Sequence, residues 1–133
     1  MAIEEDFCLL GMVSDEPDYK LCWMLNQTLG TDFQKEDDLE LYHQKLGDDQ
    51  VFSVFSFTDE NALLIYRIVS NRAENGFFLD ELKNLDYVVH IQGEISREKI
   101  GAFLQGISTI EGIRMCVPVD LTKIRNRERL LLW

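Results

Sequence analysis

The sequence has few of the residues that cross-link a chain or serve in metal sites: its 133 residues include three cysteines and two histidines. Cys8, Cys22 and Cys116 are far apart and form no Cys-x-x-Cys pair, which argues against zinc sites and thioredoxin-type redox chemistry. Unpaired cysteines among apolar residues are typical of reducing compartments, so we expect a cytoplasmic protein. No apolar run approaches the roughly 20 residues of a membrane span, and the acidic start of the chain is unlike a signal peptide. We therefore expect no membrane partner.

Positive charge is scarce as well. Thirteen Lys and Arg residues stand against 24 Asp and Glu, which gives a formal net charge of −11. Such a balance repels phosphate backbones, so we expect no nucleic-acid partner. With 46% hydrophobic residues, a chain of this length is expected to form one domain over residues 1–133 and to bury a sufficient core without a metal or a disulfide. We also expect no cofactor.

Signatures of catalysis are missing. His43 and His90 are the only histidines that can serve as a base, and neither a Gly-x-Ser-x-Gly elbow nor a Cys–His signature accompanies them. His90 shares a predicted strand face with Asp86, but four residues along a strand span roughly 13 Å, so the two side chains are too far apart for a hydrogen bond. The glycine-rich phosphate loops are absent, and Glu40-x-x-His43 lacks the second such pair that a dimetal site needs. We expect no enzyme and no metal site.

Two segments have the apolar periodicity of helices. The first runs over Pro17–Leu29, after Ser14 or Asp15 as a candidate cap and before Gly30 as a stop. The second follows Ser96 as its cap. Its apolar stripe consists of Ile100, Phe103, Leu104 and Ile107.

Several segments have the composition of strands. An exposed edge strand is expected over 32–43, followed by a turn at Gly47-Asp48-Asp49. The strands over 51–58 and 63–70, joined by a hairpin turn at 59–61, carry apolar residues on both faces. Either more of this chain or a second copy must cover the second face, so we expect a homodimer. The remaining predicted strands are 7–12, 86–92 and 113–119.

The order of these elements predicts an α+β fold. We expect a two-layer sandwich in which a mixed or antiparallel sheet has two helices on one face, ferredoxin-like or ACT-like with extra strands in the middle. A mixed sheet of another topology is the alternative.

The segment Leu121–Trp133 is both basic and apolar. We expect it to pack against the acidic body, because its last residues would otherwise form an exposed apolar patch. Its arginines, Arg125, Arg127 or Arg129, are expected to pair with carboxylates that include Asp86 or Glu81. The functional alternative is a site for an anion or an acidic partner.

One segment carries a family resemblance. FFLDELKNLDY, at Phe77–Tyr87, resembles the signature of the IPExxxVDY family of Bacteroidetes proteins, although Asp80 stands at the family proline. This resemblance implies a small, standalone, cytoplasmic bacterial protein and carries no established activity. The other segments that match, in order, are Leu9–Asn26 with its Asp18-Tyr19 step, Ser70-Asn71-Arg72, and Leu121–Leu132.

These observations give a set of candidate ligand- or partner-binding residues. Glu81, Asp86 and Asn71 either surround a ligand or partner or have a structural role, with Asp86 accepting hydrogen bonds from the tail arginines or from loop amides and Tyr87 filling the core. The complete set is Glu81, Asp86, Tyr87, Asn71, Asp18, Tyr19, Asn26, Arg125 and Arg127.

The predicted function is a non-enzymatic protein-interaction or regulatory module. The alternative is an ACT-like sensor of a small ligand, which would bind at the strand–helix junction Gly11–Asp18. Because three acids line that junction, such a ligand would be cationic.

Overall fold

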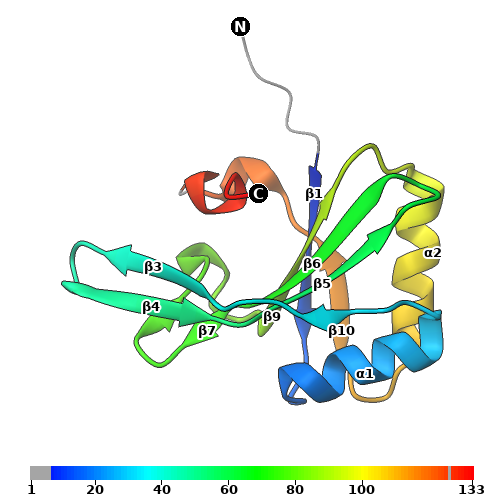
Figure 1. The fold of residues 1–133 in the computed structure, drawn as a ribbon, viewed down its shortest axis with the longest axis horizontal. Helices are drawn as coiled ribbons and strands as arrows, with labels where there is room; N and C mark the ends of the chain where they lie inside the picture. Colours follow the sequence, from blue (N-terminus) through cyan, green and yellow to red (C-terminus); the bar gives the residue numbers. More distant parts are fainter. Residues whose placement is uncertain (1–6, 126) are drawn as a thin grey trace, which may run out of the picture.

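Two α-helices and a six-stranded sheet form most of the protein (Figure 1), and the predicted α+β class is confirmed. The computed structural model describes residues 7–125 and 127–133. The helices are α1, Asp18–Leu29, and α2, Arg97–Ser108; the 3₁₀ helices are η1, Asp80–Leu82, η2, Leu121–Lys123, and η3, Arg127–Leu130. The strands are β1, Phe7–Val13; β2, Gln34–Lys35; β3, Leu39–His43; β4, Asp48–Phe52; β5, Val54–Asp59; β6, Leu64–Ser70; β7, Arg72–Ala73; β8, Gly76–Phe77; β9, Tyr87–Gln92; and β10, Met115–Pro118.

The main sheet has the strand order β10-β1-β9-β6-β5-β2, and every neighbouring pair is antiparallel. The β5–β6 hairpin lies within it, joined by a turn close to the predicted one. Helix α1 connects β1 to β2 at the far edge, and α2 connects β9 to β10 on the other side of β1. Each helix therefore joins strands that are not neighbours. The narrower ferredoxin-like or ACT-like assignment stays a prediction.

The predicted strands over 32–43 and 51–58 form one long two-stranded ribbon that is interrupted. At one end β2 pairs with β5 as the edge of the main sheet, and at the other β3 pairs with β4 as a separate two-stranded sheet. The prediction of a single strand over 51–58 is wrong, because the chain changes pairing partner at Ser53. Before this residue β4 pairs with β3, and after it β5 pairs with β6. The Ser53 carbonyl accepts a hydrogen bond from the Ser70 amide at 3.0 Å. The β3–β4 part projects beyond the main sheet (Figure 1).

The turn at the end of this ribbon lies earlier than predicted. It covers residues 44–47 and closes with Gly47, which has a φ of +65°. Asp48 and Asp49, predicted to be turn residues, belong to β4, where they pair with His43 and Tyr42. Aspartates favour turns in general, but here pairing with β3 overrides that preference.

One face of the main sheet is covered by the two helices, as predicted. Leu21 and Leu25 from α1 and Phe103 and Ile107 from α2 are buried against it. Helix α1 ends at Gly30, whose left-handed conformation, with a φ of +67°, closes the last turn as expected. This layer follows directly from the apolar periodicity of the sequence.

The predicted helix caps are correct for α2 and wrong for α1. The Ser96 hydroxyl accepts a hydrogen bond from the first turn of α2 at 3.1 Å. Pro17 occupies the N-cap of α1 and offers no side-chain acceptor, so neither Ser14 nor Asp15 caps this helix. The Ser14 hydroxyl instead donates to the carbonyl oxygen of Gly112, which ties the start of α1 to the loop before β10.

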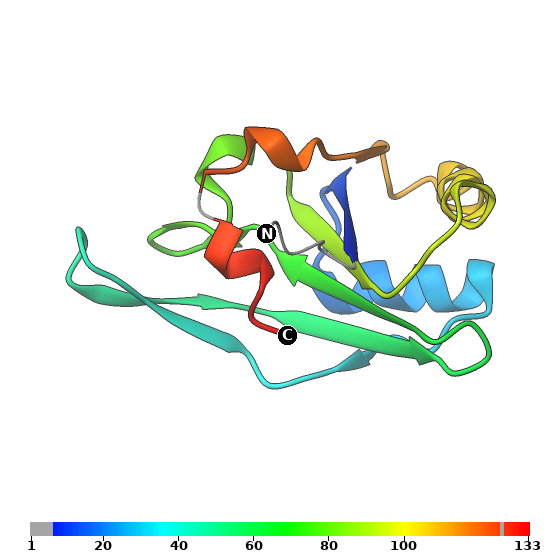
Figure 2. The ribbon, with the colours of Figure 1, turned by 90° about the horizontal axis from the view of Figure 1, so that it is seen from above.

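The opposite face of the main sheet is covered by irregular parts of the same chain. The C-terminal segment packs against the body at Ile124 and Leu130, which are only 3% and 1% exposed. Figure 2 shows this C-terminal segment, in red, and α2, in yellow, on opposite sides of the sheet. The chain itself therefore covers both apolar faces, which removes the premise on which the homodimer was predicted. The buried residues of this second core are Leu9, Phe52, Val54, Val69, Phe78, Leu79, Val88, Ile124 and Leu130.

Candidate functional site

Asn71 is fully buried and holds the segment that carries the family resemblance. Its side-chain amide donates to the carbonyl oxygens of Leu82 and Leu85 at 2.8 and 2.9 Å, and its carbonyl accepts from the Leu79 amide at 2.9 Å. The hydrogens and the oxygen of the amide group are thus all bound within the chain. Asn71 positions the backbone around η1 and has no free polar group for a ligand.

Asp86 and Tyr87 also bind other parts of the chain. The Asp86 carboxylate accepts from Arg72 Nε at 2.8 Å and from the Ser14 amide at 2.9 Å, so Arg72 fills the place predicted for a tail arginine. The Tyr87 hydroxyl donates to the carbonyl oxygen of Glu16 at 2.7 Å. Burial, more than the nearby acids, raises the pKa of Tyr87 well above its ordinary value. Both residues join the end of β1 to the start of β9.

The Glu81 side chain binds the backbone of the C-terminal segment and not one of its guanidinium groups. The Glu81 carboxylate accepts a hydrogen bond from the Arg125 amide at 2.8 Å, where the sequence predicted a guanidinium. The Arg125 side chain is exposed, and the half-buried Arg127 is the first residue of η3. Glu81 therefore holds the tail at the point where it turns into η3.

The predicted residues of α1 form none of the hydrogen bonds of this cluster, although Asp18 lies close enough to Tyr87 to contribute to its raised pKa. Asp18 begins the helix and accepts from the Tyr19 amide, while the Tyr19 ring is exposed. Asn26, near the other end of α1, binds the loop before β2 by three hydrogen bonds, two to Phe33 and one to Thr31. The structure thus brings Asn71, Glu81, Asp86, Tyr87 and Arg125 to one end of the sheet, and it leaves Asn26 at another. The hydrogen bonds described for these residues join them to other parts of the same chain.

The junction at Gly11–Asp18, predicted for a small ligand, is filled by the chain. A side chain at Gly11 would meet Leu85, since a Cβ there would lie 2.2 Å from Leu85 Cδ1. Ser14 is only 4% exposed. No specific feature of this junction favours ligand binding.

His90 is a buried residue that joins the sheet to the tail. Its Nε2 lies 3.0 Å from the carbonyl oxygen of Leu130, and its ring stacks on Phe7 at 4.6 Å between centroids. Burial, with a smaller effect from Arg67, lowers the pKa of His90 to about 4. The imidazole is therefore neutral at pH 7, and because a carbonyl oxygen can only accept, its Nε2–H donates a hydrogen bond to Leu130. The interpretation of His90 as a core-edge histidine agrees with this geometry.

The three cysteines are free; Cys22 is buried, and Cys8 and Cys116 are half-buried. Burial raises the pKa of Cys8 to about 11 and that of Cys22 and Cys116 to about 12. These thiols are protonated at neutral pH, which disfavours their use as nucleophiles.

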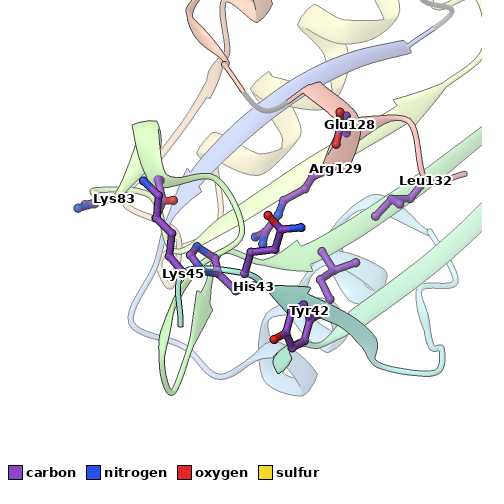
Figure 3. A pocket seen from close by; sticks show the side chains of 10 residues that line it. Tyr42, His43, Lys45, Lys83, Glu128, Arg129 and Leu132 are labelled. Atoms are coloured by element: carbon purple, nitrogen blue, oxygen red, sulfur yellow. The ribbon is translucent and has the colours of Figure 1, made fainter. Parts of the chain in front are cut away.

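A groove of about 850 Å³ lies between β3, η1 and η3 (Figure 3). Arg129 and Leu132 reach it from the C-terminal segment, while Tyr42 and His43 form the opposite wall. These walls come from parts of the chain that are more than 80 residues apart. The lining residues are Leu41, Tyr42, His43, Gln44, Lys45, Asp80, Lys83, Glu128, Arg129 and Leu132.

Cations outnumber acids in this groove, although the chain as a whole is acidic. Lys45, Lys83 and Arg129 are opposed by Asp80 and Glu128. Within residues 7–125 and 127–133, none of the three cations forms an ion pair, and the Lys83 ammonium lies only over the ring of Phe77 at 5.8 Å. Positive charge is thus available to a binding partner.

Arg129 also holds the groove together. Its guanidinium donates to the carbonyl oxygens of Phe77 and Phe78 at 3.1 and 3.0 Å, and to the Gln50 side chain at 2.7 Å. All three acceptors are uncharged, and burial lowers the pKa of Arg129. Asp80 and Glu81 lie close enough to favour the charged form, although neither forms an ion pair with this guanidinium among the described residues.

Apolar side chains gather at the groove. Tyr42 and Leu132, both lining residues, are 64% and 45% exposed, and their neighbours Leu46 and Leu131 are 50% and 57% exposed. Of the predicted site residues none lines the groove. Sequence reasoning assigned the tail cations to pairing within the chain, and its alternative, an acidic-partner site, is closer to this geometry.

No helix in residues 7–125 and 127–133 has the length and apolar composition needed to cross a membrane. In the same residues, no three His, Cys, Asp or Glu side chains converge as metal ligands would. Comparison of the chain with models of protein families, with curated proteins and with solved structures found no match.

Proposed function

We propose that the chain is a non-enzymatic protein-interaction module whose partner binds in the groove between β3 and the C-terminal segment. The observation that carries this proposal is the combination, in one groove of a chain with a net charge of −11, of three cations and exposed apolar side chains. Apolar side chains rimmed by charged ones are typical of protein-binding surfaces.

The chemistry of the groove supports binding rather than catalysis. Its lining residues, among those the structure describes, include no serine, threonine or cysteine that would serve as a nucleophile. His43 is its one histidine, and its Nδ1 accepts a hydrogen bond from the Leu46 amide at 3.2 Å. A nucleophile–base pair is therefore missing.

The proposal also includes the other expectations drawn from the sequence. Membership of the IPExxxVDY family rests on the residues of Phe77–Tyr87 and the accompanying segments, and a cytoplasmic location rests on the three free cysteines. A homodimer stays a prediction, and the groove does not require a second copy.

The test is a selection of binding peptides from a random display library on the wild-type protein. Each selected peptide is then measured by fluorescence anisotropy against the double variant Lys45→Glu/Lys83→Glu. The matched control is Lys123→Glu/Arg97→Glu, which makes the same change of net charge at exposed residues outside the groove. Among the residues that the structure describes, neither groove lysine forms an ion pair, so the fold should tolerate the exchange.

We expect the groove variant to weaken binding of the selected peptides by about tenfold or more, since each lost charge contact is replaced by repulsion. The control variant should bind them as the wild type does. Peptides that bind all three proteins equally, or a selection that yields no binder, would contradict the proposal.

A further inference from the structure

The groove runs along the edge of β3. Its lining includes the five consecutive residues from Leu41 to Lys45, which belong to β3 and the turn that follows it. Successive side chains of a strand point to opposite faces, so a pocket on one face would be lined by every second residue only. β4 contributes no lining residue. The groove therefore follows the free edge of β3, on the side away from β4.

That edge is open to another strand. Within the described residues β3 pairs with β4 alone, so every second N–H and C=O of β3 points away from the ladder. Its sequence, LELYH, contains a single carboxylate and no proline. Such an edge is a template for an added strand.

The two edges of the main sheet are better protected. β2 has only two residues and is followed by Glu36-Asp37-Asp38, and β10 ends at Pro118. Short strands, charges and proline are the usual means of preventing edge-to-edge pairing. Of the edges of β2, β10 and β3, that of β3 has the least protection, and it faces the groove.

The wall opposite the edge sets the chemistry of the partner. Arg129 stands on η3, Lys83 directly follows η1, and Lys45 follows β3 at the turn, so cations lie at the edge and across from it (Figure 3). The Tyr42 side chain lies on the face of β3 opposite to that of Leu41 and His43, and its ring is exposed. A strand along β3 would thus meet positive charge on one side and apolar surface on the other.

From these observations we infer that the partner is an extended acidic segment of another protein, which adds to β3 as a further strand. Carboxylates at alternate positions face Lys83 and Arg129, and apolar side chains between them lie beside Tyr42. Main-chain hydrogen bonds provide affinity in this mode of recognition, and alternate side chains provide specificity. This inference rests on the proposed function and names its partner.

The probe is a synthetic peptide of about eight residues, within the usual length of a strand, in which Glu and Val alternate. Two further versions carry N-methyl groups on alternate amides, one in each register, and a Lys-Val peptide reverses the charge. Binding to the wild-type protein is measured by isothermal titration calorimetry. Hydrogen exchange of the amides of residues 39–43 is followed with and without the peptide.

We expect the Glu-Val peptide to bind and the Lys-Val peptide to bind about tenfold more weakly or not at all. One N-methylated register should lose about tenfold in affinity and the other much less, because only alternate amides of an added strand face β3. The amides of residues 39–43 should gain protection.

Equal binding of both N-methylated registers and the parent peptide would overturn strand addition, and so would a failure of the Glu-Val peptide to bind. Neither result affects the proposed function if library peptides still depend on Lys45 and Lys83. If wild-type protein alone already protects residues 39–43 and sediments as a dimer, a second copy occupies the edge and the inference is wrong.

Discussion

The two faces of the main sheet are covered by different kinds of structure. Helices α1 and α2 satisfy most of their backbone groups internally and need only present an apolar stripe to the sheet. On the other face, short strands, 3₁₀ turns and loops do the covering, and their buried N–H and C=O groups need partners elsewhere. Asn71, Arg129 and His90 supply such partners.

This difference has consequences for stability and for function. The helical layer, α1 and α2, should remain stable after the loss of any single polar side chain. The stability of the irregular layer, which consists of short strands, 3₁₀ helices and loops, should depend strongly on a few polar side chains. The irregular layer also carries the groove, since η1 and η3 end at the surface beside β3. Loops on a fixed scaffold commonly carry binding residues.

The largest difference between the faces should come from two asparagines that each make three hydrogen bonds. Asn71→Ala should lower the free energy of unfolding by about 4 kcal/mol, because it leaves buried backbone groups of the second layer without partners. Asn26→Ala, on the helical side, should cost about 1 kcal/mol, because Asn26 is only half-buried and water can replace it. Urea denaturation measures both, and equal losses would contradict the comparison.

The next effect tests whether the tail is part of the fold. Leu130→Ala should cost about 3 kcal/mol, because this side chain is 1% exposed in the second core. Its neighbour Leu131 is 57% exposed, so Leu131→Ala should change stability by less than about 0.5 kcal/mol. Thermal unfolding of the two variants gives the answer. If Leu130→Ala leaves the melting temperature unchanged, the tail does not belong to the core.

Acid should weaken the irregular layer through His90. Its pKa is about 4 in the folded state against 6.5 for the ordinary group, so the unfolded state binds more protons between these values. Stability therefore falls as the pH is lowered through this window, by about 2 kcal/mol between about pH 7 and pH 5. His90→Gln keeps a donor for Leu130 but does not titrate, and it should remove this loss in urea titrations at each pH. His43→Gln is the control and should retain it.

The smallest effect concerns two arginines of the tail. Arg129→Gln should cost about 1.5 kcal/mol, because it removes hydrogen bonds to Phe77 and Phe78 that a shorter side chain does not reach. Arg125→Gln should cost less than about 0.5 kcal/mol, since only the Arg125 amide meets Glu81. Chemical denaturation distinguishes them, and a larger loss for Arg125→Gln would mean that the exposed side chain matters more than its contacts indicate.

The helix-covered face was predictable from the sequence because its signals are local. The apolar residues of α1 and α2 recur at helical spacing, and Ser96 and Gly30 mark ends of these helices. The β5–β6 hairpin and the burial of the tail were predictable in the same way, from apolar patterns and a turn.

The irregular face was less predictable because its interactions join distant residues. Arg129 and Gln50 are 79 residues apart in sequence, and no local sequence pattern around either residue indicates their hydrogen bond. Asn71 was identified as a polar residue of interest, but only the structure places its amide against the backbone around η1. The groove was not predictable for the same reason, since its walls come from distant segments that meet only in the folded chain.

The most direct test of the account maps a binding partner onto the two faces. The ¹⁵N-labelled protein is titrated with the alternating Glu-Val peptide, and backbone amide shifts are followed by NMR. We expect the changes to concentrate in residues 41–45, 80–83 and 128–132, which line or adjoin the groove. Changes centred on α1 and α2, or no changes at all, would contradict the claim that the irregular face is the binding face.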